Sequence, residues 1–228
     1  MLELQNVETG YGGSQVLFGV NMQIEKGQIV SLLGRNGMGK TTTVRSIMGL
    51  TPAKAGSIRF KGQEISRHKS FRIARAGIGL VPEGRQIFPN LSVRENLVAT
   101  ARGQGWNLEK IYDLFPRLAE RQNNMGNQLS GGEQQMLAIG RALLTNPDLL
   151  IFDEASEGLA PVIRTDIWAC IRKLRDLAQT VLIIDGNLDA LMAVCDQHYV
   201  LEKGQIVWNG SSEQFANAPE IKKNHLGI

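Results

Sequence analysis

One eight-residue string constrains this chain more than any other feature of its sequence. The string fits the pattern G-x-x-x-x-G-K-[ST], with an apolar stretch, Gln28–Leu33, before it and a helical pattern, Thr41–Met48, after it. Glycines let the backbone turn back so that several N–H groups face one anion, and the following helix adds the positive end of its dipole. A loop that binds phosphate groups is therefore predicted. Its residues are Gly34, Arg35, Asn36, Gly37, Met38, Gly39, Lys40 and Thr41.

This loop predicts a nucleoside triphosphate and a magnesium ion as ligands. Lys40 is expected to contact the β- and γ-phosphates, and the Thr41 hydroxyl to coordinate Mg²⁺. Thr42, the next residue of the helix, joins the predicted nucleotide-binding set. The alternative is a chance glycine-rich turn followed by a lysine. The preceding strand and the following helix favour the phosphate loop, because that context is the one the motif requires.

A second apolar stretch, Leu149–Phe152, ends in the acidic pair Asp153 and Glu154. At the carboxyl end of a strand beside a phosphate loop, a carboxylate can hold magnesium through water, and we assign this role to Asp153. Glu154 would then face the γ-phosphate and polarise the attacking water as general base. The alternative is a solvated strand end, which is common for isolated Asp-Glu pairs.

The pattern of apolar residues predicts an α/β fold in which a mainly parallel sheet is covered on both faces. The strands at Leu2–Val7 and Val20–Ile24 are expected to form an accessory antiparallel layer. Other predicted strands are Gln28–Leu33, Ser57–Phe60, Gly77–Val81, Leu149–Phe152, Thr180–Ile184 and a hairpin of Tyr199–Leu201 with Gln205–Val207. Predicted helices are Thr41–Met48, Gly131–Leu144, Ile163–Leu177 and Leu188–Val194. We expect one domain, residues 1–228, with a helical lobe inserted at about residues 83–128.

Composition places the chain among ordinary globular proteins, with 43% hydrophobic and 21% charged residues. The net charge of +3, from 25 basic and 22 acidic residues, is too balanced to indicate nucleic acid as a partner. The first residues lack the pattern of a secretory signal. The longest apolar stretches have strand length, well short of the ~20 residues of a membrane-spanning helix.

A third motif, LSGGEQQ at residues 129–135, lies between the phosphate loop and the acidic pair. It resembles the LSGGQ signature of ABC ATPases, with Glu133 in the last position, and the resemblance extends over essentially the whole chain. The family resemblance implies a P-loop NTPase core that hydrolyses ATP. It also implies that Ser130 and Gly132 close on the ATP held by a second subunit, so that two subunits enclose two nucleotides. A plain helix cap of the capping-box type is the structural alternative, and both can hold.

Further positions follow from the same resemblance. Tyr11 matches the aromatic residue that stacks on adenine, with Val16 as a nearby apolar contact; an ordinary turn tyrosine is the alternative. Glu83 occupies the place of a glutamine that usually touches Mg²⁺ and the membrane partner. Ala160 stands where the family has aspartate. Gly186 stands where it has a histidine that contacts the γ-phosphate.

The departures at positions 160 and 186 predict slow turnover at this chain's own nucleotide site. None of the three histidines, His68, His198 and His225, is in register to replace the missing one. Paired with a standard paralogue, the chain would form two unequal sites. One alternative function is therefore a nucleotide-gated subunit with negligible catalysis. A second alternative, which does not depend on these departures, is an ABC ATPase of DNA repair or translation.

The strings VPEGRQIFP (81–89) and EGLAP (157–161) resemble the ABC subgroup that powers uptake of branched-chain amino acids, with urea and amide importers as similar relatives. This resemblance implies transmembrane permease subunits, a second ATPase subunit (a paralogue or another copy) and, indirectly, a substrate-binding protein as partners. It also implies a peripheral location on the cytoplasmic face of the plasma membrane. Ile87, Phe88 and Leu91 are candidate anchors for a permease helix, or else part of the lobe's own core.

Overall fold

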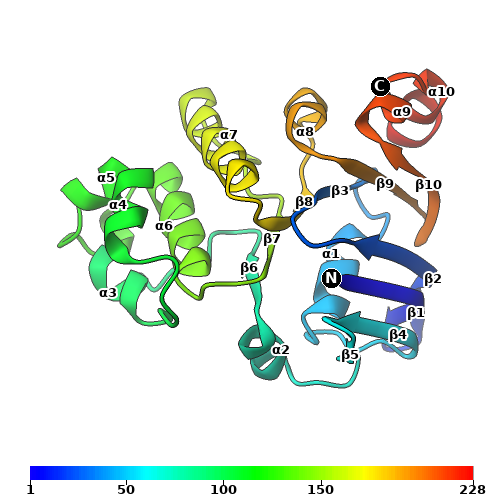
Figure 1. Ribbon diagram of the computed structural model, residues 1–228, viewed down its shortest axis with the longest axis horizontal. Helices are drawn as coiled ribbons and strands as arrows, with labels where there is room; N and C mark the ends of the chain where they lie inside the picture. The colour runs from blue at the N-terminus through cyan, green and yellow to red at the C-terminus, as the bar shows by residue number, and fades with distance from the viewer. Residues whose placement is uncertain (228) are drawn as a thin grey trace.

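Two sheets organise the computed structural model, which describes residues 1–227 (Figure 1). The larger sheet has the strand order β10-β9-β3-β8-β7-β6, and all neighbours are parallel except the β9–β10 hairpin. The mainly parallel sheet and the hairpin predicted from the sequence are confirmed. The strands are β3 (Ile29–Leu33), β6 (Ile78–Val81), β7 (Leu149–Asp153), β8 (Thr180–Ile184), β9 (Gln197–Glu202) and β10 (Gln205–Ser211).

The strands β3, β7 and β8 are mostly apolar because both faces of the sheet are covered. Every residue of β3, β7 and β8 is buried. Parallel strands connected through helices have this composition, since the helices pack on both faces. Two apolar clusters result, one on each face of the larger sheet. Packing on both faces fixes the position of the strands and of the residues at their carboxyl ends.

The smaller sheet is antiparallel, with the strand order β2-β1-β4-β5. Its strands are β1 (Leu2–Tyr11), β2 (Ser14–Ile24), β4 (Ala55–Phe60) and β5 (Gln63–Glu64). The accessory antiparallel layer is confirmed, but β1 and β2 are longer than predicted. Register shifts between them interrupt the alternation of apolar residues that marks a strand in the sequence.

Four helices lie together at one side of the larger sheet (Figure 1, green). Within the segment predicted as a helical lobe, residues 83–128, the chain is not helical between α3 and α4. Capping by Ser92 and Asn107 starts these two helices. The group comprises α3 (Val93–Val98), α4 (Leu108–Leu114), α5 (Pro116–Glu120) and α6 (Gly131–Leu143), with a short 3₁₀ turn, η1 (Gly126–Gln128), before α6.

The other helices flank the sheets. The longest one has a buried apolar face formed by Ile163, Ile167, Ile171 and Leu174. The structure adds one helix, α2, that the sequence analysis did not predict, and three short C-terminal segments. These elements are α1 (Lys40–Ile47), α2 (Ser70–Ala76), α7 (Pro161–Asp176), α8 (Leu188–Val194), α9 (Ser212–Ala216), α10 (Pro219–Ile221) and the π-helical η2 (Lys222–Leu226).

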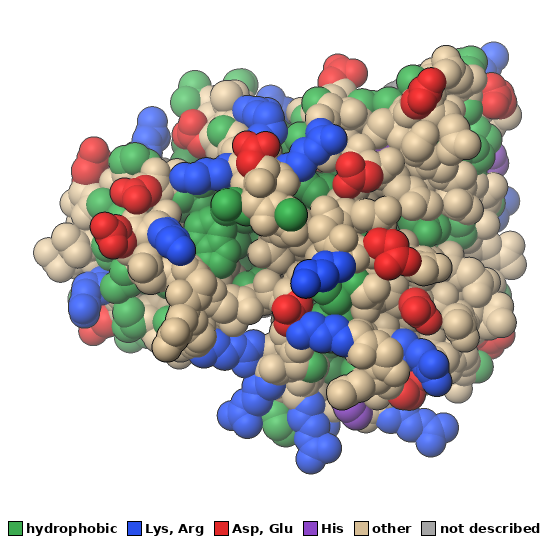
Figure 2. All heavy atoms as spheres, viewed as in Figure 1, with side chains coloured by type: hydrophobic (Ala, Val, Ile, Leu, Met, Phe, Trp, Pro, Cys, Tyr) green, Lys and Arg blue, Asp and Glu red, His purple; other side chains and the backbone are tan. Residues whose placement is uncertain are grey.

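Charged side chains of both signs are mixed over most of the visible face (Figure 2). None of the helices within residues 1–227 combines the length and the apolar character that crossing a membrane requires.

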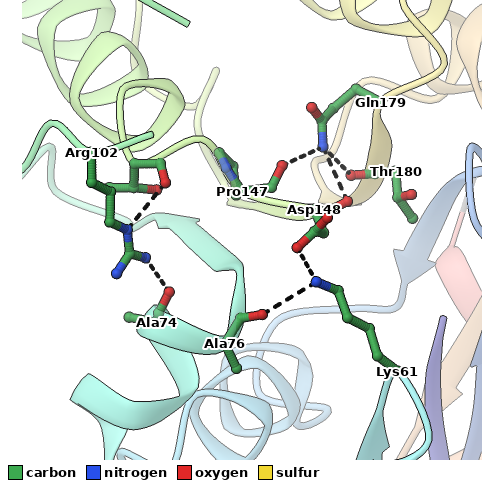
Figure 3. A network of polar contacts seen from close by, with 9 residues as sticks. Lys61, Ala74, Ala76, Arg102, Pro147, Asp148, Gln179 and Thr180 are labelled. Atoms are coloured by element: carbon green, nitrogen blue, oxygen red, sulfur yellow. Dashed lines mark hydrogen bonds and ion pairs between the residues drawn. The ribbon is translucent and has the colours of Figure 1, made fainter. Parts of the chain in front are cut away.

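A polar network ties together the amino-terminal edge of the larger sheet (Figure 3). Lys61 donates to the Asp148 carboxylate just before β7, and the Gln179 amide donates to the carbonyls of Pro147 and Asp148 at 3.0 and 3.1 Å. Arg102 donates to the carbonyls of Ala74 and Thr145 and so joins α2 to the end of α6. These contacts connect the segments that precede β7 and β8 to the neighbouring elements.

Candidate functional site

The phosphate loop lies between the end of β3 and the start of α1, as the sequence predicts. Two of its glycines are required by close contacts. A Cβ at Gly34 would lie 2.4 Å from the carbonyl oxygen of Leu201, and a Cβ at Gly39 would lie 2.8 Å from a methyl group of Leu17. Both residues have positive φ, of 152° and 108°. The loop therefore has the tight turn that the motif predicts, and residues larger than glycine do not fit at positions 34 and 39.

Lys40 is held at the mouth of this loop. Its Nζ donates to the carbonyl oxygens of Gly34 at 2.9 Å and Arg35 at 3.2 Å, and lies 3.7 Å from Oε1 of Glu154. The side chain is only 10% exposed. The ammonium group therefore lies between the loop and the second acid, where it can neutralise a phosphate group.

Two pockets meet at this lysine. The first has a volume of about 250 Å³, and its lining is Val16, Asn36, Gly37, Gly39, Lys40, Thr41, Thr42 and Glu154. The second, of about 550 Å³, extends past Glu154 toward the loop after β8; its lining is Gly34, Asn36, Lys40, Glu154, Ser156, Glu157, Gly158, Arg164, Asp185, Gly186 and Asn187. Asn36, Lys40 and Glu154 line both, so an elongated ligand can pass from one into the other.

Among the residues predicted in the phosphate loop and around the adenine, Tyr11, Arg35 and Met38 do not line these pockets. Tyr11 is 45% exposed, and its hydroxyl lies 3.5 Å from the Thr42 hydroxyl at the edge of the first pocket. Met38 anchors the loop instead, since its sulfur and its carbonyl accept hydrogen bonds from the backbone of Lys203 and Gly204. Arg35 faces the C-terminal segment near Gly227.

Asp153 is a buried carboxylate without a protein partner for one of its oxygens. It ends β7 opposite Ile184 of β8 and is 4% exposed, and within residues 1–227 its Oδ1 has no hydrogen-bond partner. Burial, and then the charge of Glu83, raise the pKa of Asp153 to about 6. A buried oxygen without a partner fits a magnesium site, because a cation would satisfy it and restore the ionised form.

Glu154 follows directly, in a backbone conformation that is uncommon for glutamate. Its φ is 53°, and its N–H donates to the carbonyl of Ile184 at 2.9 Å. Burial, followed by a hydrogen bond with Glu157, raises the pKa of Glu154 to about 7 despite the nearby Lys40. A carboxylate with such a pKa is suited to accept a proton from water near neutral pH.

Glu83 lies in an exposed loop between β6 and α3, close enough to Asp153 for its charge to raise that residue's pKa. Two residues of this loop, Arg85 and Gln86, have positive φ. Side chains of α6 hold the loop: Gln134 accepts from Arg85 at 3.4 Å, and Arg141 donates to the Gln86 carbonyl at 2.9 Å. The Glu83 loop therefore lies between Asp153 and α6, the helix that begins with the signature motif.

The signature segment starts α6 and stands apart from the two pockets around Lys40. Ser130 is the N-cap; it accepts from the N–H of Glu133, whose carboxylate accepts from the N–H of Ser130 at 2.8 Å. Arg121 pairs with the same carboxylate at 2.8 Å. The capping box is therefore present. Ser130 itself is exposed, which leaves its face of the helix end open to another molecule.

We expect Gly132→Ala to destabilise the fold. A Cβ at Gly132 would lie 2.6 to 2.9 Å from three carbons of Ile163 at the start of α7. Overpacking of this kind costs about 1–3 kcal/mol, or roughly 2–4 °C of Tm per kcal/mol in a chain of this size. Thermal unfolding followed by circular dichroism measures the change. Gly186→Ala is the matched control, because nothing lies within 4 Å of a Cβ there. Equal Tm values for both variants would contradict the packing argument.

Gly186 leaves an open position in the wall of the second pocket. The neighbouring Asp185 is fixed, since its carboxylate accepts from the Ser156 hydroxyl at 2.5 Å and from the N–H of Asn187 at 2.9 Å. None of the three histidines lines either pocket. His198 is buried between the hydroxyls of Ser31 and Ser212, at 2.6 and 2.8 Å.

Six residues of the second pocket were not among the predicted site residues: Ser156, Glu157, Gly158, Arg164, Asp185 and Asn187. A signal for Asp185 was present, because it follows the end of a buried parallel strand and ligands bind at the carboxyl ends of such strands. Arg164 lies three residues beyond the string at 157–161 and belongs to no motif.

The chain is similar to known proteins over its full length. The family described as ABC transporter matches residues 17–157. A high-affinity branched-chain amino acid transport ATP-binding protein of Pseudomonas aeruginosa, BraG, is 40% identical over 100% of both chains. The lipopolysaccharide export system ATP-binding protein LptB of Escherichia coli is 35% identical over 99% of this chain and 97% of its own.

Solved structures agree with this fold. An ATP-binding cassette of an ABC transporter in its ADP conformation has a TM-score of 0.84 at 27% identity, covering 98% of this chain and 96% of its own. A dimeric ATP-binding cassette in a post-hydrolysis state, bound to ADP and Pi, has a TM-score of 0.79 at 26% identity, covering 93% and 99%.

Proposed function

Because the chain belongs to the ABC transporter family, as an ATPase subunit coupled to transport, we propose that it powers an importer of branched-chain amino acids. The observation that carries the proposal is the 40% identity to BraG over the whole of both chains, against 35% for LptB. Import of urea or a short amide is the second candidate, suggested by the strings at 81–89 and 157–161. The similarity to LptB makes export a third outcome to be tested.

We propose that ATP extends across both pockets. The base end lies near Val16 with Tyr11 at its edge, and the terminal phosphate lies where Lys40 and Glu154 meet, because these residues line both pockets. Thr41 and Asp153 would hold Mg²⁺, with Glu83 nearby; the ion would neutralise phosphate charge and the Asp153 oxygen that lacks a partner. Glu154 accepts a proton from the attacking water.

Completion of the site requires a second subunit. Ser130 and Gly132 lie outside both pockets around Lys40, so the helix end that they form is available to the nucleotide of a partner. ABC ATPase subunits dimerise and act with transmembrane permeases, and one structural relative is itself a dimer with ADP and Pi. We propose a paralogue as the partner, because Gly186 and Ala160 would then affect only part of the assembly.

A groove beside the Glu83 loop is our proposed contact with the permease. It has a volume of about 290 Å³ and lies between α2, β6 and α6. Phe88 is 42% exposed near it, under the guanidinium of Arg141 at 4.2 Å, and is the better candidate anchor. Ile87 packs against the chain's own core.

Residues 92–121 share one apolar cluster with β7 and β8, which supports a single domain.

Association with a permease, which in turn would bind a substrate-binding protein, would place the chain at the cytoplasmic face of the plasma membrane. The test is an uptake assay in cells that lack the chromosomal copy of the gene. We expect loss of labelled leucine uptake, restoration by the intact chain and no restoration by Lys40→Ala. Unchanged leucine uptake with loss of urea uptake, or with a defect in export, would replace the proposed substrate but leave the ATPase assignment standing.

The raised pKa values of the acidic pair predict a pH effect on the stability of the nucleotide-free, magnesium-free protein. The folded pKa values of about 6 for Asp153 and about 7 for Glu154 exceed the ordinary values of 3.8 and 4.5. Between the ordinary and the raised values the folded state holds more protons, so the contribution of this pair to the free energy of unfolding falls as pH rises.

The measurement is Tm as a function of pH, from about 4 to about 8, for the protein and for Glu154→Gln and Asp153→Asn. Because other groups also titrate, the readout is the difference between the protein and each variant. We expect both variants to gain stability relative to the protein as pH rises. A difference that stays constant with pH would contradict the assigned protonation.

A further inference from the structure

The segment around α2 concentrates positive charge. Between Ile65 and Pro82 the sequence has four basic residues and no acidic residue, whereas the whole chain has a net charge of only +3. The basic residues are Arg67, Lys69, Arg72 and Arg75. Together with Phe71 they form what we term the α2 patch.

The patch is exposed and its charges are not neutralised. Ile73 is the buried side chain that anchors α2, while Phe71 is 52% exposed. The guanidinium groups of Arg72 and Arg75 lie 6.0 and 5.9 Å from the centre of the Phe71 ring. Among residues 1–227, no carboxylate forms an ion pair with any of the four basic side chains. Figure 2 shows Lys and Arg side chains projecting at the lower edge, where Figure 1 places α2.

The patch adjoins the groove that we propose for the permease. Ala74 of α2 lines this groove, together with Arg85, Arg102 and Arg141 and without any acidic residue. If a cytoplasmic segment of a membrane-embedded permease occupies the groove, α2 is brought toward the membrane surface. This step rests on the proposed function.

We propose that the α2 patch binds anionic lipid headgroups beside the permease. Basic side chains near a membrane are attracted to phosphate-bearing lipids, and the gain is roughly additive in the number of charges. Because no carboxylate within residues 1–227 pairs with these four side chains, binding to lipid phosphate breaks no ion pair. Phe71 supplies an exposed apolar side chain of the kind that membrane-surface segments bury at the boundary between headgroups and acyl chains. One exposed aromatic residue is too few for the stacking platform that single-stranded nucleic acid uses.

The test measures cosedimentation of the full-length chain with vesicles of phosphatidylcholine alone and of phosphatidylcholine mixed with phosphatidylglycerol. The patch variant carries R67Q, K69Q, R72Q and R75Q. The matched control carries K26Q, R117Q, R172Q and K173Q, four exposed basic residues on other elements that have no ion pair within residues 1–227. Each variant has the same formal net charge, +3 − 4 = −1.

We expect the protein to bind the anionic vesicles and not the neutral ones. The patch variant should lose about tenfold or more in affinity and the control about twofold or less, with salt weakening the binding. An equal loss in both variants, no vesicle binding, or stronger binding to a single-stranded oligonucleotide than to vesicles would overturn the proposal.

ATP binding by the patch variant separates this inference from the proposed function. None of the five residues of the patch lines the pockets around Lys40, so the affinity for ATP should not change. Normal ATP binding without vesicle binding would refute only the lipid contact. Absence of ATP binding in the unaltered protein would refute the proposed function, whatever the vesicles show.

Discussion

Glu154→Gln should bind ATP as well as the unaltered protein does and lose hydrolysis by about 10²–10⁴-fold, the range that a positioned general base contributes. The physical reason is that the amide has the shape of the carboxylate but cannot accept the proton of the attacking water. Glu154 is the acid that lines both pockets and lies 3.7 Å from Lys40, and burial raises its pKa to about 7. Steady-state phosphate release and equilibrium nucleotide binding, measured on the assembled transporter, give the two values.

Glu157→Gln is the matched control for this substitution. Glu157 is exposed, lines only the second pocket and interacts with the Glu154 carboxyl. We expect this variant to keep most of its hydrolysis, because it removes a neighbouring charge and leaves the base. If Glu157→Gln were as inactive as Glu154→Gln, the assignment of the general base would be wrong.

Gly186→His should raise hydrolysis at this chain's own site by as much as roughly a hundredfold, the effect of adding one well-placed donor to developing charge. Position 186 lines the second pocket beside Lys40 and Glu154, and nothing lies within 4 Å of a Cβ there. The Cβ of a histidine therefore meets no neighbour, and the imidazole supplies the donor that the family resemblance implies at this position.

The measurement for Gly186→His is single-turnover hydrolysis in the assembled transporter, with the partner subunit inactivated at its own general base. Gly186→Ala is the control, since it adds a side chain without a donor, and its rate should not change. An unchanged rate for Gly186→His, with an unchanged Tm, would show that the glycine is not what limits turnover. If Glu154→Gln abolished transport while the same change in the partner were harmless, the proposed inequality of the two sites would be wrong.

The parts of the site that the sequence predicts are those specified by short stretches of chain. The loop at residues 34–41 and the Asp153–Glu154 pair each follow a fully buried strand, and the parallel order β3-β8-β7 brings them to one edge. Their contact across the sheet was predictable because ligands bind at the carboxyl ends of parallel strands. The position of Tyr11 outside the first pocket was not predictable, because it depends on the conformation of the β1–β2 turn.

Elements that lack a regular pattern of apolar residues were missed or misjudged. α2 has one buried residue, Ile73, so its sequence carries no helical periodicity. The five residues of α9 are also too few, although Ser211 and Gln214 form a capping box that could have marked its start. β1 and β2 were underestimated because bulges shift their register after Leu4 and again after Val7.

The central claim is that the loop ending in Lys40 holds a magnesium nucleotide against the carboxylates that follow β7. Equilibrium binding of Mg-ATP by the purified chain and by Lys40→Ala tests it most directly. We expect saturable binding to the unaltered chain and a loss of about tenfold or more in Lys40→Ala, since a charge-assisted contact to phosphate is removed. Equal affinity in the two proteins, or no binding by the unaltered chain, would contradict the claim.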